Sequence, residues 1–106
     1  SYLLKQTGNK AVVEEMIKTF LEQLPVELAV LRDAIEQEDR PAVFHAAHVL
    51  RNSTGLFGLQ QTIGLTLLQI EKMARNDYDL DEIRLLFYEV DKACKMILEN
   101  SSNQIC

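Results

Sequence analysis

Apolar residues recur every three or four positions along most of the chain, a spacing that is typical of amphipathic helices. The first such stripe runs from Val13 to Leu24, and Asn9 is the predicted N-cap ahead of it. Proline has no backbone N–H and fits the first turn of a helix, so Pro25 is predicted to begin a second helix. The apolar face of this second helix continues to Ile35. The N-terminal third of the chain is therefore predicted to form two consecutive helices.

Turn-forming residues divide the rest of the chain into three more helices. Asp39 is the predicted N-cap of a third helix, which ends within residues 55–58, where glycine permits a left-handed cap. A fourth helix is predicted over residues 60–75. Asp79, with a glutamate three positions later, gives the last helix a start that resembles a capping box. This last helix is predicted to fray after Glu99.

Short connections place consecutive helices antiparallel to one another. The sequence therefore predicts an all-α fold, an antiparallel up-and-down four-helix bundle, in which the second and third of the five segments can merge or bend. Tyr2, Leu3 and Leu4 are expected to form a short additional N-terminal helical segment. A chain of 106 residues holds one hydrophobic core, so residues 1–106 are predicted to be a single domain. Its core covers about residues 9–99, and residues 100–106 form a fraying tail.

The net charge of −5 bears on which kinds of molecule the chain binds. Nucleic acids and anionic lipids both require clustered basic residues, so neither nucleic-acid binding nor direct membrane contact is expected. No apolar run approaches the roughly 18 residues of a membrane span, and no signal peptide opens the sequence. Because the sequence begins with Ser1 rather than Met, we expect it to be a part of a longer protein, which leaves room for a membrane anchor elsewhere.

The cysteines indicate the redox compartment. Cys94 lies within a helical pattern and Cys106 is the last residue, so the pair does not form a disulfide framework. This usage suits a reducing, cytoplasmic environment. Cys94 is predicted to be a small core residue rather than a reactive thiol.

The third helix carries a second stripe of residues beside its apolar face. Successive helical residues are rotated by about 100°, which identifies the buried positions as Val43, Ala47 and Leu50. His45 lies nearly opposite these positions and points to solvent. His48 lies on the flank as a half-exposed imidazole, one turn from the guanidinium of Arg51. The flank stripe consists of Phe44, His48, Arg51 and Gly55.

Three interpretations of His48 follow from the residue types. The first is a solvated surface histidine. The second is a metal site with His45, but no cysteine and no carboxylate at ligand spacing completes it, so no metal site is predicted. The third is a nucleophilic histidine that accepts a phosphoryl group, with Arg51 balancing the added charge. The residue types alone do not decide between the first and the third.

The sequence around His48 resembles a known family. Residues 47–51 read Ala-His-Val-Leu-Arg, and Gly58 follows ten positions after the histidine. This string is similar to the phosphorylated helix of the histidine-containing phosphotransfer (HPt) domain of two-component phosphorelay systems. The resemblance covers roughly residues 12–75, and further matching positions are residues 20–25 and Asp39. Ile70 and Glu71 also match, but one residue later than the usual spacing, which indicates a slightly longer loop within residues 58–62.

Two positions depart from the family pattern beside the histidine. Arg51 stands where lysine is usual, which keeps the positive charge but changes its hydrogen-bond geometry. Asn52 stands where a small glycine is usual, which adds bulk where the backbone of a partner approaches. Neither departure removes the nucleophile, and Asn52 bears on the choice of partner.

The resemblance implies a function and a division of labour. His48 is expected to accept a phosphoryl group from the phospho-aspartate of one receiver domain and to pass it to another, with Arg51 stabilising the phosphoryl charge. The Mg²⁺ is expected to come from the receiver, so this domain binds no cofactor. No Walker A loop or glycine-rich ATP loop is present, which is typical of a relay without turnover of its own rather than an enzyme. A hybrid sensor histidine kinase is the expected parent protein, and the isolated domain is expected to be a monomer.

The same resemblance suggests which residues meet the receiver. Phe44 is either a docking contact or lateral packing, and Gly58 is predicted to be structural, at a close helix–helix corner. A receiver-docking adaptor that carries no phosphate is an alternative function, and a structural or oligomerising helical domain is another. The predicted partner-binding residues are Phe44, Asn52, Gly55 and Leu56.

Overall fold

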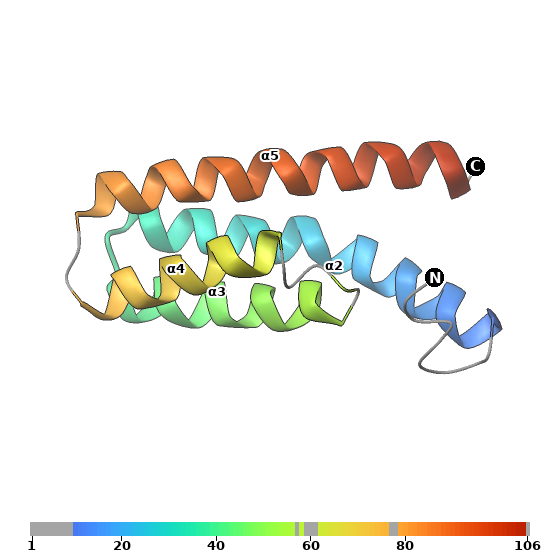
Figure 1. Ribbon diagram of the computed structural model, residues 1–106, viewed down its shortest axis with the longest axis horizontal. Helices are drawn as coiled ribbons and strands as arrows, with labels where there is room; N and C mark the ends of the chain where they lie inside the picture. Colours follow the sequence, from blue (N-terminus) through green and yellow to red (C-terminus); the bar gives the residue numbers. More distant parts are fainter. Residues whose placement is uncertain (1–9, 57, 59–61, 77–78, 106) are drawn as a thin grey trace.

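The computed structural model of the chain is an all-α bundle (Figure 1). It describes residues 10–56, 58, 62–76 and 79–105, with residues 100–105 described by their backbone alone. Within these ranges the helices are α2 (Lys10–Glu36), α3 (Arg40–Gly55), α4 (Ile63–Arg75) and α5 (Leu80–Ile105). The predicted fold class is confirmed. The predicted N-cap Asn9 and the segment at Tyr2 to Leu4 lie outside the described residues.

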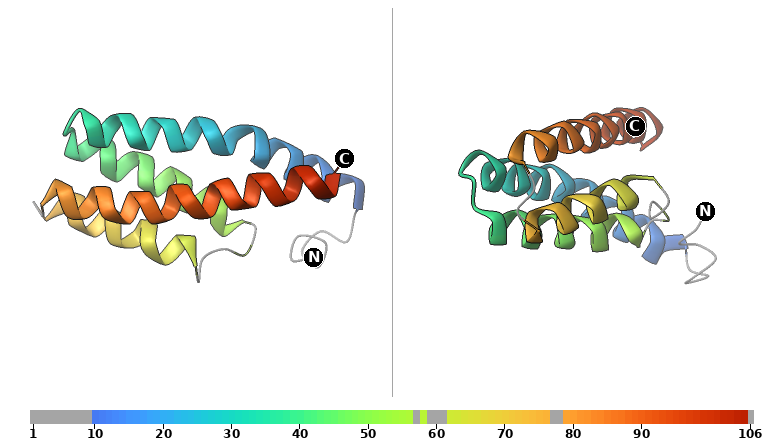
Figure 2. Two further views of the ribbon diagram at one scale, coloured as in Figure 1. Left: turned by 90° about the horizontal axis from the view of Figure 1, so that it is seen from above. Right: turned by 60° about the vertical axis from the view of Figure 1, so that its left-hand side comes forward.

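The four helices run alternately up and down, and each packs against its neighbours in the sequence, with α5 returning to α2. The shorter helices α3 and α4 lie side by side, and their contact is the most extensive one in the bundle. The longer helices α2 and α5 extend beyond them at the end where the N-terminus of α2 and the C-terminus of α5 lie (Figure 2). In the part of the chain that the structure describes, no helix is both long enough and apolar enough to span a membrane.

All four helices contribute to one hydrophobic core. The predicted buried positions of α3 are confirmed, since Val43, Ala47 and Leu50 are fully buried. Cys94 is buried as predicted, and this burial, assisted by the charge of Asp91, raises the pKa of its thiol to about 12. The largest of the fully buried side chains in the core are Leu24, Leu31, Leu50, Leu67, Ile70 and Ile83.

The prediction that Pro25 begins a second helix is wrong, because α2 continues through it. Proline leaves the carbonyl of the preceding turn without its helical donor, which favours a break. Here Leu24 and Leu28 on either side of Pro25 are both buried in the core, whereas Pro25 itself is exposed. Packing of the continuous apolar stripe therefore holds one long helix where local preference predicts two.

The ends of the other helices mostly follow the predicted signals. Asp39 is the N-cap of α3, and its carboxylate accepts a hydrogen bond of 3.2 Å from the backbone N–H of Ala42. Helix α3 ends at Gly55, within the predicted window. The carboxylate of Asp79 likewise accepts from the backbone N–H of Asp81 at the start of α5, at 2.9 Å. These caps confirm the predicted starts of both helices.

Two predicted helix limits differ from the structure. Helix α4 begins at Ile63, and the predicted start at Gln60 lies outside the described residues. Helix α5 continues to Ile105, so the predicted fraying after Glu99 is wrong for the backbone. No glycine or proline follows Glu99, and without such a stop signal the helix runs on.

Replacing Leu50 with alanine is expected to lower the free energy of unfolding by about 2–5 kcal/mol, because Leu50 is fully buried between the helices and its loss leaves a cavity. Urea denaturation followed by circular dichroism measures this change. The neighbouring residue Val49 is 37% exposed, so Val49→Ala is the matched control, with an expected change within about 0.5 kcal/mol. An equal decrease in the free energy of unfolding for both variants would contradict the burial of Leu50.

Candidate functional site

The two histidines of the chain both lie on α3 but in different surroundings. His45 is exposed. The side chain of His48 is 44% exposed, as its predicted position on the flank requires, and it lies against α4. His48 is therefore accessible to another molecule while its inner edge contacts the protein.

The inner edge of His48 contacts a buried carboxylate, that of Glu71 on α4. The Glu71 side chain is only 4% exposed, and its Oε1 lies 3.0 Å from Nδ1 of His48. Arg51 donates from Nε to Oε2 of the same carboxylate and from Nη2 to Oε1, the latter at 3.2 Å. A buried carboxylate is costly unless its oxygens accept hydrogen bonds, and here both oxygens do.

Helical periodicity explains why these three side chains meet. His48 and Arg51 are three residues apart, so they project from the same side of α3. Glu71 follows the buried Ile70 and precedes the buried Ala74 by three residues, which places it at the border of the buried face of α4. Close packing of α3 on α4 then brings this border against the flank of α3.

The hydrogen bond to Glu71 determines the tautomer of His48. A carboxylate only accepts, so Nδ1 carries the proton and donates it to Oε1. Nη2 of Arg51 also lies 3.2 Å from Nδ1, but two N–H groups do not hydrogen-bond each other; they approach because they share the acceptor Oε1. In the neutral ring, the other nitrogen, Nε2, then carries the lone pair.

Arg51 is held in its charged form. Its hydrogen bond to Glu71 raises the pKa of the guanidinium, the charge of Glu71 adds to this effect, and partial burial opposes it. The side chain is 31% exposed. Arg51 thus contributes a fixed positive charge at the inner edge of the imidazole.

A second contact to His48 comes from Phe44, one turn earlier on α3. The two rings are parallel within 9°, with centroids 6.1 Å apart. Phe44 is half-buried and packs against the core, and Cζ of Arg75 lies 5.2 Å from its ring centroid. Of the two predicted roles of Phe44, lateral packing is confirmed, and docking stays a prediction.

The other predicted docking residues lie together beyond Arg51. Asn52, Gly55 and Leu56 line one groove of about 410 Å³ with Arg51 and residues of α4. A Cβ atom built on Gly55 would meet nothing within 4 Å, so this part of the groove is open. The α4 residues of the groove are Gly64, Leu65 and Leu68.

Phe44 does not line that groove. It lies on the other side of His48, in a groove of about 520 Å³ with Arg40, Pro41, Ala74 and Arg75. The predicted partner-binding residues thus lie on both sides of the histidine, along the face that α3 and α4 share.

Gly58 has a structural reason to be glycine. Its φ is 78°, in the left-handed region that other residues adopt at a cost. Its amide donates a hydrogen bond of 3.1 Å to the carbonyl of Gly55. This turn just beyond α3 supports the predicted structural role.

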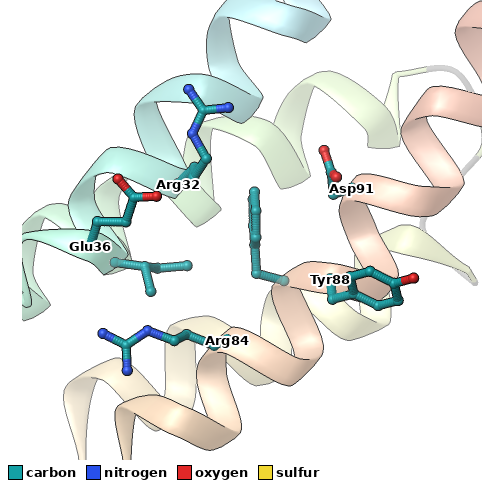
Figure 3. A pocket seen from close by; sticks show the side chains of 7 residues that line it. Arg32, Glu36, Arg84, Tyr88 and Asp91 are labelled. Atoms are coloured by element: carbon teal, nitrogen blue, oxygen red, sulfur yellow. The ribbon is translucent and has the colours of Figure 1, made fainter.

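A further groove, of about 270 Å³, lies between α2 and α5 and contains no residue of the His48 site (Figure 3). Its charged side chains have both signs, and several are paired with neighbours on their own helix: Arg84 with Asp81 at 2.8 Å, and Asp91 with Lys95 at 2.9 Å. The structure also brings no group of three or more potential metal ligands together among the residues that it describes.

Glu71 is a residue of this site that the sequence does not predict to be part of it. The family pattern includes it, but the sequence predicts no role for it. The available signal was a carboxylate next to an apolar stripe, formed by Ile63, Leu67, Ile70 and Ala74. A charged residue at such a border is buried only where it is paired, so its position already indicated a partner on a neighbouring helix.

The structure thus combines a four-helix bundle with a half-exposed histidine whose Nδ1 is held by a buried carboxylate. The family model described as Hpt domain matches residues 15–99, and the chain belongs to this family. No match is found among curated proteins, and none among solved structures. Hpt domains are phosphotransfer intermediates of two-component relays, and they interact with receiver domains of response regulators.

Proposed function

We propose that His48 accepts a phosphoryl group from the phospho-aspartate of one receiver domain and relays it to a second receiver domain. The observation that carries this proposal is the hydrogen bond from Nδ1 to Glu71, because it leaves a lone pair on Nε2 of a half-exposed ring. His45 is exposed as well, but no hydrogen bond to its ring is observed among the described residues.

The reaction balances without any other group from this domain. The lone pair of Nε2 attacks phosphorus, an N–P bond forms, and the P–O bond to the aspartate of the receiver breaks with its electron pair on the leaving carboxylate. The ring then carries phosphorus on Nε2 and hydrogen on Nδ1, so it becomes positively charged. Glu71 lies 3.0 Å from Nδ1 and stabilises this charge as it develops.

The division of labour with the receiver follows from the donor set. Both oxygens of Glu71 already accept hydrogen bonds from His48 and Arg51, so this carboxylate is a poor ligand for Mg²⁺. We expect the metal to be bound by the receiver. The domain then supplies only the nucleophile, its orientation and the charge around it.

The docking surface consists of the two grooves beside His48. Leu56 and Leu65 are exposed at the rim of the groove that contains Asn52 and Gly55, and such apolar side chains suit a protein partner. Asn52 is exposed in this groove, where its side chain is accessible to a docking partner. A hybrid kinase as parent protein, a cytoplasmic location and a monomeric state stay predictions.

Incubation with a phosphorylated receiver tests the proposal. The wild-type domain is expected to acquire a label that is labile in acid and stable in alkali. Receiver binding without any label would support a docking adaptor instead, and self-association without receiver binding would support a structural domain. Either result would overturn the relay.

Replacing Arg51 with glutamine is expected to shorten the lifetime of the phosphohistidine and to slow its formation by about three- to tenfold, because a positive charge beside the imidazole, partly screened by solvent and by Glu71, is lost. Stopped reactions followed by gel autoradiography measure both quantities. Arg51→Lys is the matched control, since it keeps the charge and is expected to recover most of the lifetime. Unchanged kinetics in Arg51→Gln would contradict a role for the charge.

A further inference from the structure

The orientation of the His48 ring needs more than the bond to Glu71. A single hydrogen bond at Nδ1 acts on one atom of the imidazole, and the ring plane still varies with the side-chain torsions within the range that this bond tolerates. The lone pair of Nε2 lies in the ring plane, so any tilt changes the direction in which it points. In-line attack on phosphorus depends on that direction.

The ring of His48 is stacked against that of Phe44. The two rings are parallel within 9° at a centroid distance of 6.1 Å, which is the range of an offset stack. Phe44 is half-buried and packs against the core, which restricts the positions that its ring can take.

Arg75 on α4 contacts the ring of Phe44. Its guanidinium carbon lies 5.2 Å from the centroid of the Phe44 ring, a cation–π contact. Glu71 and Arg75 are one turn apart on α4, just as His48 and Phe44 are one turn apart on α3. Two residues of α4 therefore contact this side of α3. Glu71 accepts a hydrogen bond from Nδ1 of His48, and Arg75 contacts the ring of Phe44, which in turn stacks on His48.

We propose that Phe44, held by Arg75, is a positioning residue that fixes the plane of the His48 ring and so aims Nε2 at the incoming phosphoryl group. This inference rests on the proposed function. It differs from a docking role for Phe44. A positioning residue affects the rate of transfer from every phosphoryl donor, whereas a docking residue affects the rate only with donors that contact it.

A small phosphoryl donor separates the two roles. Phosphoramidate transfers its phosphoryl group to imidazole: Nε2 attacks phosphorus, the N–P bond to the histidine forms, and the P–N bond of the donor breaks as its protonated nitrogen leaves as ammonia. The donor reaches His48 without filling the groove beside Phe44. Its reaction with the protein therefore reports the nucleophile alone.

The experiment compares Phe44→Leu, Arg75→Gln and the control Val49→Ala in the full chain, with phosphoramidate and with a phosphorylated receiver. Phe44→Leu is expected to slow both reactions by a similar factor, about three- to tenfold, and Arg75→Gln to slow both by about twofold. Val49 is exposed, so Val49→Ala is expected to react as the wild type. Arg75 is exposed, so its variant tests the inference even if Phe44→Leu fails to fold.

Nuclear magnetic resonance of the His48 ring gives a readout that does not depend on transfer. In Phe44→Leu the ring-proton signals are expected to shift and broaden, while the proton stays on Nδ1. A normal phosphoramidate rate with slow receiver transfer would show that Phe44 is a docking contact and overturn the inference, as would wild-type rates with both donors. If the ring signals change as expected but the wild type takes no phosphoryl group from any receiver, the proposed function fails and the contact between the rings stands.

Discussion

Replacing His48 with glutamine is expected to abolish labelling by a phosphorylated receiver, a loss of at least about a thousandfold that reaches the background of the assay. An amide nitrogen has no available lone pair, so the variant cannot form the N–P bond. Because the side chain of His48 is 44% exposed and lies outside the core, glutamine is expected to leave the fold intact. Transfer of radioactive phosphate, with acid and alkali treatment of the product, measures the effect.

His45 provides the matched control for this result. It lies on the same helix, three residues earlier, and is exposed. His45→Gln is expected to be labelled at the wild-type rate. Label that persists in His48→Gln but disappears in His45→Gln would show that the other histidine is the acceptor.

Replacing Glu71 with glutamine is expected to produce the second largest loss, a slowing of transfer by about ten- to a hundredfold. The amide of glutamine either accepts from Nδ1 or donates to it, so the variant no longer restricts hydrogen to Nδ1, and the fraction of rings with a lone pair on Nε2 falls. The variant also removes the negative charge that stabilises the positively charged ring of the product. Glutamine has nearly the same shape, so the packing of α3 on α4 is expected to be retained.

Two measurements together test the role of Glu71. The transfer rate is measured as for His48, and ¹⁵N resonances of the imidazole report which nitrogen carries hydrogen. Glu89 is an exposed carboxylate on α5, so Glu89→Gln is the control for loss of one negative charge and is expected to react normally. A wild-type rate in Glu71→Gln, or a ring protonated on Nε2 in the wild type, would contradict the assignment of the lone pair to Nε2.

Local signals in the sequence were sufficient to predict most of the fold. The cap residues Asp39 and Asp79 act within a few residues of their own position, and the structure has both as caps. Pro25 is the exception, because the stripe through Leu24 and Leu28 is buried by the other helices and outweighs the local preference of proline. Whether tertiary packing outweighs a local helix-breaking signal cannot be predicted from the spacing of residues in one segment.

In the candidate site, too, the sequence predicts the residues that share one helix but not those that come from another. His48 and Arg51 lie on one helix, so rotation per residue was enough to place them on a common, half-exposed flank. Glu71 and Arg75 reach the site from α4, and their contacts depend on how α3 and α4 are aligned along their length. That alignment follows from the packing of the two buried faces, which the pattern of a single helix does not contain.

The most direct test of the relay is to determine which nitrogen carries the phosphoryl group. The domain is labelled with ¹⁵N in its histidines, phosphorylated by a receiver, and examined by ¹⁵N and ³¹P nuclear magnetic resonance. We expect one phosphohistidine, at His48, with phosphorus bonded to Nε2 and hydrogen retained on Nδ1 beside Glu71. Phosphorus on Nδ1, or on either nitrogen of His45, would contradict this mechanism.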